Sequence, residues 1–332
     1  MEKFSKRILL LVSTIIVAVL IVRTNPSATE KLPSSLLRKI EDTSLSSGTH
    51  LVLSEIKMSH NQPFVRNSAF TAEQAAVIAP ALESRGEKKN LPQKEFSGFT
   101  GEAFLAGEVA VSDMIISFQE DRRWPTASLT KLMTALVALD NLKSDQEVVI
   151  QAEDIGTEKD LAGLKPQEVF TVHDLVKAMM RVSSNNAALA LTDFYGRPKF
   201  IQLMNDKARE LGMSQTVFFD ETGLSYLNQS TATDLKRLTE YILHFYPEVL
   251  TMSREKEGEI VEQTRNEHRK LININIFAGV PNFLGGKTGY TDDAGGNLVS
   301  VFTIQGREII IVVLGTKDRF LETEKITNYL GL

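Results

Sequence analysis

Ser128-Leu129-Thr130-Lys131 opens the stretch of sequence that decides the fold, residues 128–140. The apolar positions of this stretch are Leu129, Leu132, Met133, Leu136 and Val137. They recur every three or four residues, which is the spacing of one helix face, so the stretch predicts a helix. Ser128 and Lys131 stand three residues apart at its start. Their side chains should therefore lie on one face, about one turn apart.

A serine and a lysine placed in this way can perform nucleophilic catalysis. A serine hydroxyl is a poor nucleophile until a base takes its proton. A desolvated lysine close to other cations has a lowered pKa and can act as that base. A helix N-terminus also places free N–H groups near the serine, where they can stabilise an oxyanion. The pattern is common, however, because Ser54 and Ser253 also begin a Ser-x-x-Lys sequence.

Two further motifs make the combination specific. Ser183-Ser184-Asn185 falls in a break between two predicted helices, where a loop can direct polar side chains into a cleft. Alone, it would be explained as a turn, since Ser and Asn bond their own backbone. Lys287-Thr288-Gly289 lies in a predicted strand, where a lysine and a small hydroxyl residue can meet an anionic substrate. Gly289 lets a peptide backbone approach closely. The alternative is an edge strand weakened by glycine.

The rest of the chain predicts a mixed fold. Three β segments, 285–291, 297–304 and 307–314, follow one another with short connections, which predicts an antiparallel meander. The stretch 106–118 predicts two more short strands. Beyond 128–140, helices are predicted over 172–180, 186–195, 198–211, 231–245 and 321–330.

Composition excludes several classes of function. The 332 residues are 42% hydrophobic and 24% charged with a net charge of −5, which is ordinary for a globular protein and gives no reason to expect nucleic-acid binding. Cysteine is absent, which removes disulfides and thiolate chemistry. The five histidines are scattered without the spacing of metal ligands. We therefore expect neither a metal nor an organic cofactor.

The N-terminus predicts a membrane segment. Lys3, Lys6 and Arg7 precede an uncharged apolar run, 8–22. The positive flank should stay in the cytoplasm and place the rest of the chain outside. We expect residues 1–23 to be an anchor, in preference to a cleaved signal, and 24–100 a stalk with local structure. Residues 101–332 would then form the catalytic domain.

Residues 104–315 resemble the serine-type D-alanyl-D-alanine carboxypeptidases, the low-molecular-mass penicillin-binding proteins of bacteria. The three motifs are the signature of penicillin-binding proteins and of class A β-lactamases. Matching phrases around them include residues 127–136, 204–208, 222–224 and 286–291. The resemblance implies an α+β fold of the β-lactamase/transpeptidase type. In that fold an antiparallel sheet is flanked by helices, and the active site lies between it and a mainly helical subdomain.

The resemblance also implies roles, on a peptidoglycan stem peptide that ends in D-Ala-D-Ala. Ser128 would attack the carbonyl between the two D-alanines, and Lys131 would accept its proton. Ser183 would pass a proton to the leaving D-alanine. Asn185 and Lys287 would hold the hydrogen-bond network and the substrate. Thr288 would bind the terminal carboxylate, with Gly289 beside it. The backbone N–H groups of Ser128 and Tyr290 would stabilise the oxyanion. A β-lactam would trap the same serine.

The sequence departs from the family pattern at three places and leaves alternatives open. Asn186 stands where the family often has Asp, Asp220 replaces a usual Asn, and Ile274 replaces a residue that is often polar or basic. The same residues would serve a D,D-endopeptidase that cuts cross-links. A class A β-lactamase is less favoured, because no counterpart of its glutamate-containing loop is found. A catalytically weak wall-binding protein of the same fold is the non-enzymatic alternative.

Overall fold

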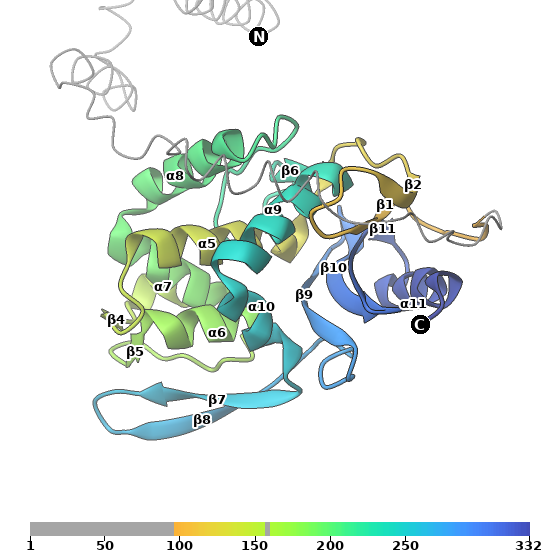
Figure 1. Cartoon of the computed structure of the whole chain (residues 1–332). Helices are drawn as coiled ribbons and strands as arrows, with labels where there is room; N and C mark the ends of the chain where they lie inside the picture. Colours follow the sequence, from red (N-terminus) through yellow and green to blue (C-terminus); the bar gives the residue numbers. More distant parts are fainter. Residues whose placement is uncertain (1–95, 157–159) are drawn as a thin grey trace, which may run out of the picture. The chain divides into compact units, whose positions relative to one another are not determined.

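The computed structural model describes residues 96–156 and 160–332. Its main sheet has five strands in the order β2-β1-β11-β10-β9, and all neighbours are antiparallel (Figure 1). The strands are β1 (Ala103–Glu108), β2 (Met114–Phe118), β9 (Phe283–Thr291), β10 (Gly295–Ile304) and β11 (Arg307–Thr316). Since β9, β10 and β11 pair in chain order, the predicted meander is confirmed.

The central strands are buried on both faces, and their side chains alternate between two cores. Ile310 and Val312 of β11 pack in the core shared with most of the helices. Ile311 and Val313, which point the opposite way, pack with Ile326 of α11 (Arg319–Leu330). The sheet therefore lies between α11 on one face and the other helices on the other face (Figure 1).

The larger helical layer follows the predicted pattern closely. Its elements are η2 (Ala127–Leu129), α5 (Thr130–Asn141), η3 (Ala152–Asp154), α6 (Val172–Val182), α7 (Asn185–Tyr195), α8 (Arg197–Glu210), α9 (Ala232–Phe245) and α10 (Pro247–Arg254). In α5 the side chains from Thr130 to Ala138 are all buried. A helix enclosed on all sides is a rigid support for Ser128 and Lys131 at its start.

Three small two-stranded sheets and α10 were not predicted. The sheets pair β3 (Trp124–Pro125) with β6 (Gln229–Ser230), β4 (Glu147–Val149) with β5 (Val169–Thr171), and β7 (Glu257–Glu262) with β8 (Glu267–Ile272). The β7–β8 hairpin is held across its strands by ion pairs such as Lys270–Glu257, 2.5 Å, and His268–Glu259, 3.1 Å. Charged pairs of this kind carry no apolar alternation, so hydrophobic periodicity does not reveal them.

The predicted membrane segment, 1–23, and nearly all of the predicted stalk, 24–100, lie outside the described residues. Their boundary with the catalytic domain stays a prediction. Within 96–156 and 160–332, no helix has the length and apolar character needed to cross a membrane.

Candidate active site

Ser128 lies in η2, directly before the buried helix α5. Ala127, the residue that precedes it, has a φ of 46°, a left-handed conformation that costs a non-glycine residue about 1–3 kcal/mol. One turn further on, Lys131 is fully buried, and its Nζ lies 3.1 Å from Ser128 Oγ. The two side chains predicted to share a helix face are therefore within proton-transfer reach of each other.

Lys131 also joins two other segments of the chain. Its Nζ donates to Asn185 Oδ1 at 2.7 Å and to the carbonyl oxygen of Thr222 at 2.7 Å. Asn185 is the first residue of α7, and Thr222 belongs to the loop after α8. The lysine is thus fixed by contacts from three parts of the chain far apart in sequence.

The second motif forms the turn between α6 and α7. Ser183 ends α6 in a left-handed conformation, with φ 59° and ψ 33°. Its Oγ accepts a hydrogen bond from Lys287 Nζ at 2.8 Å. Lys131 and Lys287 therefore bind this turn through two of its polar residues, Asn185 and Ser183.

Lys287 lies in β9, the edge strand of the sheet, and is 1% exposed. Its Nζ also donates to the carbonyl oxygen of Thr288 at 2.7 Å. Burial holds the pKa of Lys287 well below its ordinary value, and the positive charges of Lys131 and Arg319 lower it further. A lowered pKa makes the Lys287 ammonium a stronger acid, which suits proton transfer to a leaving group.

Gly289 allows close packing, but of a different kind from the one expected. A Cβ built at this position would lie 3.1 Å from the Thr126 carbonyl oxygen and 3.2 Å from the Ser128 nitrogen. The glycine therefore lets β9 pack against η2, within the protein itself. The next residue, Tyr290, is 60% exposed, and its hydroxyl donates to Asp292 at 3.2 Å.

Sequence reasoning noted Asp220 only as a departure and gave it no role at the site. Its Oδ1 accepts from the nitrogen and hydroxyl of Thr222, at 2.7 and 2.8 Å, and from Gly223 N at 2.6 Å. Its Oδ2 accepts from Ser225 N at 2.8 Å. These bonds fix the turn whose Thr222 carbonyl accepts a hydrogen bond from Lys131. Asp220 therefore helps to hold the Lys131 side chain in place indirectly, through this turn.

Arg319 was missed altogether. It begins α11, and its buried Nε has no hydrogen-bond partner among the residues that the structure describes. Burial lowers the pKa of Arg319, and its charge in turn lowers the pKa of Lys287. An arginine with a free donor close enough to affect Lys287 is suited to an anionic group. No motif in the sequence indicates Arg319, because it lies at the start of α11, two strands beyond Lys287 and among other charged residues.

Two other sequence features have structural roles. Ser253, which also begins a Ser-x-x-Lys pattern, donates through Oγ to Leu250 O at 2.8 Å and accepts from Gly286 N at 2.9 Å. Ser54 lies outside the described residues. Ile274 donates its backbone N–H to Arg181 O at 3.2 Å, so it lies beside the end of α6.

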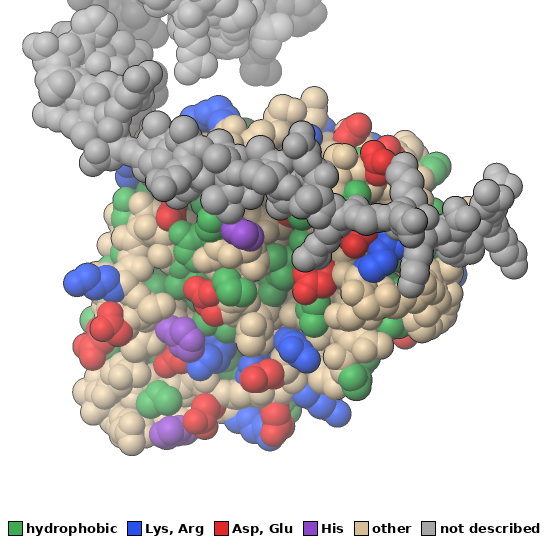
Figure 2. Space-filling model, viewed as in Figure 1, with side chains coloured by type: hydrophobic (Ala, Val, Ile, Leu, Met, Phe, Trp, Pro, Cys, Tyr) green, Lys and Arg blue, Asp and Glu red, His purple; other side chains and the backbone are tan. Residues whose placement is uncertain are grey.

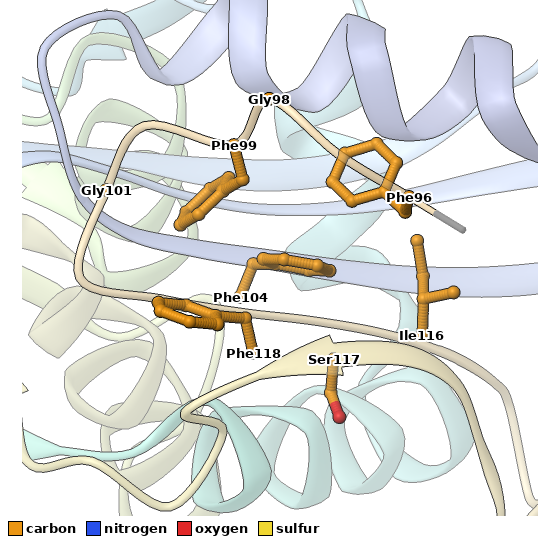
Figure 3. Close-up of a pocket in the computed structure, with 8 residues that line it drawn as sticks. All are labelled: Phe96, Gly98, Phe99, Gly101, Phe104, Ile116, Ser117 and Phe118. Atoms are coloured by element: carbon orange, nitrogen blue, oxygen red, sulfur yellow. The ribbon is translucent and has the colours of Figure 1, made fainter.

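One hollow of the described surface lies away from these residues and has no titratable group in its lining. It has a volume of about 410 Å³ and is lined by Phe96, Gly98, Phe99, Gly101, Phe104, Ile116, Ser117 and Phe118. Figure 3 shows the four phenyl rings gathered together and the Ser117 side chain pointing away from them. A hollow of this composition offers shape and apolar contact but no acid–base chemistry.

Among the described residues, neither the charged side chains nor the possible metal ligands form a second candidate site. In Figure 2, acidic and basic side chains are interspersed over the visible face. In the ranges 96–156 and 160–332, no group of three or more His, Cys, Asp or Glu side chains is placed to hold a metal ion.

Comparison with known proteins gives one consistent result. Residues 95–318 match the family model described as D-alanyl-D-alanine carboxypeptidase, Peptidase_S11. The D-alanyl-D-alanine carboxypeptidase DacC of Escherichia coli K12 is 32% identical over 282 residues, which cover 79% of this chain and 64% of DacC. A D-alanyl-D-alanine endopeptidase of Haemophilus influenzae is 34% identical over 208 residues, 60% of this chain and 70% of the relative.

A solved structure shares the fold. Penicillin-Binding Protein D2 of Listeria monocytogenes, in the ampicillin-bound form, superposes with a TM-score of 0.61 at 29% identity. The match covers 69% of this chain and 97% of that protein. The predicted α+β, transpeptidase-like fold class is thereby confirmed.

Proposed function

Because the chain belongs to the D-alanyl-D-alanine carboxypeptidase family, we propose that it is a serine carboxypeptidase that removes the terminal D-alanine from peptidoglycan stem peptides. One observation carries the proposal. Lys131 Nζ lies 3.1 Å from Ser128 Oγ and 2.7 Å from Asn185 Oδ1, while Lys287 Nζ lies 2.8 Å from Ser183 Oγ. A nucleophile, a base and a proton-donating pair thus meet in one site.

In the first half-reaction, Ser128 Oγ attacks the carbonyl carbon between the two D-alanines while Lys131 takes its proton. The resulting oxyanion is stabilised by backbone N–H groups, for which Ser128 itself and Tyr290 are the candidates. The C–N bond then breaks, and the departing amine of D-alanine takes a proton through Ser183, supplied by the Lys287 side. The products are an ester on Ser128 and free D-alanine.

Before the second half-reaction, the proton that Lys131 took from Ser128 must pass to Lys287, which gave one to the leaving amine. Neutral Lys131 then takes a proton from the water that attacks the ester carbonyl and returns it to Ser128. The ester bond breaks, Ser128 regains its proton, and the shortened stem peptide leaves with a carboxylate. A β-lactam ring opened by the same serine would leave a stable ester, so we expect β-lactams to inhibit the enzyme. The ampicillin-bound relative supports this expectation.

The substrate carboxylate would be held by the hydroxyl of Thr288 and by Arg319. Thr288 is 4% exposed and lies next to Lys287 in β9. Arg319 brings a positive charge and an Nε donor that no described residue uses. A carboxypeptidase needs such a site, since its substrate differs from an internal peptide by that terminal charge.

Fluorescent-penicillin labelling of the full chain, followed together with D-alanine release from a D-Ala-D-Ala peptide, tests the proposal. Both should be present in the wild-type protein and absent in Ser128→Ala. A folded wild-type protein that neither labels nor releases D-alanine would contradict the proposal and favour a wall-binding role.

A D,D-endopeptidase is the second candidate, because one of the similar curated proteins is named as such. The same residues would cut a D-alanyl cross-link whose leaving group is larger. A cross-linked dimeric muropeptide offered beside a linear pentapeptide separates the two. Cleavage of the dimer at the higher kcat/KM would identify an endopeptidase.

The proposal places the catalytic domain outside the cytoplasm, held at the membrane by residues 1–23. Its support is the sequence alone, in which Lys3, Lys6 and Arg7 flank the apolar run 8–22. Fractionation of cells that express the full chain tests this. The protein should sediment with membranes and be digested by protease added to spheroplasts.

A further inference from the structure

The two residues that flank Asn185 bind Gly156 and Asp160, which lie on either side of residues 157–159. Ser184 donates through Oγ to Asp160 Oδ2 at 2.8 Å, and Asn186 N donates to the same oxygen at 2.9 Å. Asn186 Oδ1 accepts from Gly156 N at 3.1 Å. Three hydrogen bonds therefore join the Ser183–Asn185 turn to Gly156 and Asp160. Two of them end on the Asp160 carboxylate, and the third on the Asn186 side chain.

The contact is buried and its polar groups are satisfied. Ser184 is 2% and Asn186 is 4% exposed. The second oxygen of Asp160 accepts from Ala162 N at 2.9 Å, so both carboxylate oxygens are used. Ser184 Oγ also accepts from Ala187 N at 3.0 Å and caps α7. An anion at this end of α7 is favourable, because the first N–H groups of a helix have no partner within it.

The turn that this contact supports is strained and carries the reacting groups. Ser183 is left-handed, a conformation that persists in a non-glycine residue only where the surroundings enforce it. Its Oγ must meet Lys287, and Asn185 Oδ1 must meet Lys131, at 2.8 and 2.7 Å. Release of Ser184 from Asp160 would allow both to move.

We propose that Asp160 is a positioning residue for the Ser183–Asn185 turn and thereby for proton transfer in the acylation step, an inference that rests on the proposed function. Asp160 acts through Ser184 and the N-terminus of α7. Asn186 contributes its backbone N–H to Asp160 and its side-chain oxygen to Gly156.

Loss of the Asp160 carboxylate should weaken the contact without touching the reacting groups. Asp160→Asn keeps one oxygen, so its amide nitrogen must face either Ala162 N or the pair Ser184 Oγ and Asn186 N, and the negative charge at the start of α7 is lost. The acylation rate constant with fluorescent penicillin and the kcat for D-alanine release should both fall, by about 10- to 100-fold, since small displacements of reacting groups have effects of this size. KM should change less than about twofold, because the carboxylate site is untouched. Asn186→Asp keeps an oxygen that can accept from Gly156 N and should change both rates less.

The double variant Asp160→Asn/Ser184→Ala tests whether these two side chains act through one contact. Its loss in acylation rate should be smaller than the product of the two single losses, as expected of residues that share a contact. Two unrelated destabilising changes would instead multiply. Ser184→Ala, which removes a single hydroxyl, should give a smaller loss of kcat and keeps the test valid if Asp160→Asn does not fold.

Asp206→Asn, a partly exposed position in α8 paired with Arg209, is the matched control and should leave every rate unchanged. Wild-type acylation rates in folded Asp160→Asn or Ser184→Ala, or a double variant whose losses simply multiply, would overturn the inference while the proposed function stands. A wild-type chain without labelling or D-alanine release would overturn the proposed function, and the inference with it.

Discussion

Lys287 of β9 and Ser183 of the α6–α7 turn are joined by a hydrogen bond of 2.8 Å, although 104 residues separate them in the chain. The sheet and the helical layer therefore meet at the two residues proposed to protonate the leaving group. Any movement of one layer relative to the other alters this distance. The link also explains why a lysine is buried here despite the cost of desolvating its charge.

Lys287 should make the stability of the enzyme depend on pH. Its pKa in the folded chain is lowered well below the ordinary value, first by burial and then by Lys131 and Arg319. The unfolded chain, in which the pKa of a lysine is about 10.4, therefore binds the proton more tightly. Unfolding takes up a proton in the window between the two pKa values, so wild-type stability should rise with pH through that window.

Lys287→Met removes this group and provides the comparison. We expect calorimetry to show the melting temperature of the wild type rising relative to the variant as the pH increases toward about 10.4, the ordinary pKa of lysine in an unfolded chain. D-alanine release by the variant should fall about 10²- to 10⁴-fold, the usual range for a lost proton-transfer group. A constant difference in melting temperature across this increase in pH would contradict the lowered pKa.

Asp220 should tolerate asparagine and not alanine. Three of its four hydrogen bonds go to Oδ1, and only the one from Ser225 N goes to Oδ2. An asparagine keeps an oxygen at the first position, which accounts for the Asn that related sequences usually have there. Asp220→Asn should retain most of the activity.

Asp220→Ala removes all four bonds and leaves the turn beside Lys131 unsupported. We expect it to lower the free energy of unfolding by about 1–3 kcal/mol, the cost of leaving buried donors unsatisfied. Penicillin acylation should fall more than in Asp220→Asn. Denaturant titration and acylation kinetics of the two variants check this, and equal behaviour of both would argue against the turn as the support of Lys131.

Gly289→Ala should impair acylation through the protein's own backbone. The added Cβ would lie 3.1 Å from Thr126 O and 3.2 Å from Ser128 N, which is tighter than ordinary contact. These neighbours are backbone atoms and cannot rotate away, so η2 should shift and carry Ser128 with it. We expect the acylation rate constant to fall about 10- to 100-fold with a small change in melting temperature. Unchanged acylation would show that η2 has room to move.

How much of the site the sequence predicts depends on how far apart in the sequence the contacting residues are. Ser128 and Lys131 are three residues apart on a helix, so their proximity follows from helix geometry. Asp160 joins the site by bonds to the start of α7, Arg319 by its charge near Lys287, and Asp220 through its own turn, whose Thr222 carbonyl meets Lys131. No local pattern indicates which of many acidic or basic residues makes such a contact.

The same distinction holds for the fold. Strands β10 and β11 are rich in Val and Ile, and short turns join β9, β10 and β11, so the prediction of the meander was correct. The hairpin β7–β8 is held by polar pairs such as Lys270–Glu257 on an exposed surface and was missed. The approach of a substrate backbone at Gly289 stays a prediction.

Arg319 offers the last test, because it separates binding of the substrate carboxylate from the chemistry at Ser128. Arg319→Ala should lower kcat/KM about 10- to 100-fold for a peptide that ends in a free D-alanine carboxylate, the loss of a charge-assisted hydrogen bond of about 1.5–3 kcal/mol. The same peptide with a C-terminal amide should lose little. Loss of the Arg319 charge should also raise the pKa of Lys287, and since Lys287 must be protonated to supply the leaving group, the basic limb of the pH–rate profile should move to higher pH. Arg319→Lys keeps the charge and should leave that limb in place. If both peptides lose activity equally in Arg319→Ala, the arginine supports the fold of the site and does not bind the carboxylate.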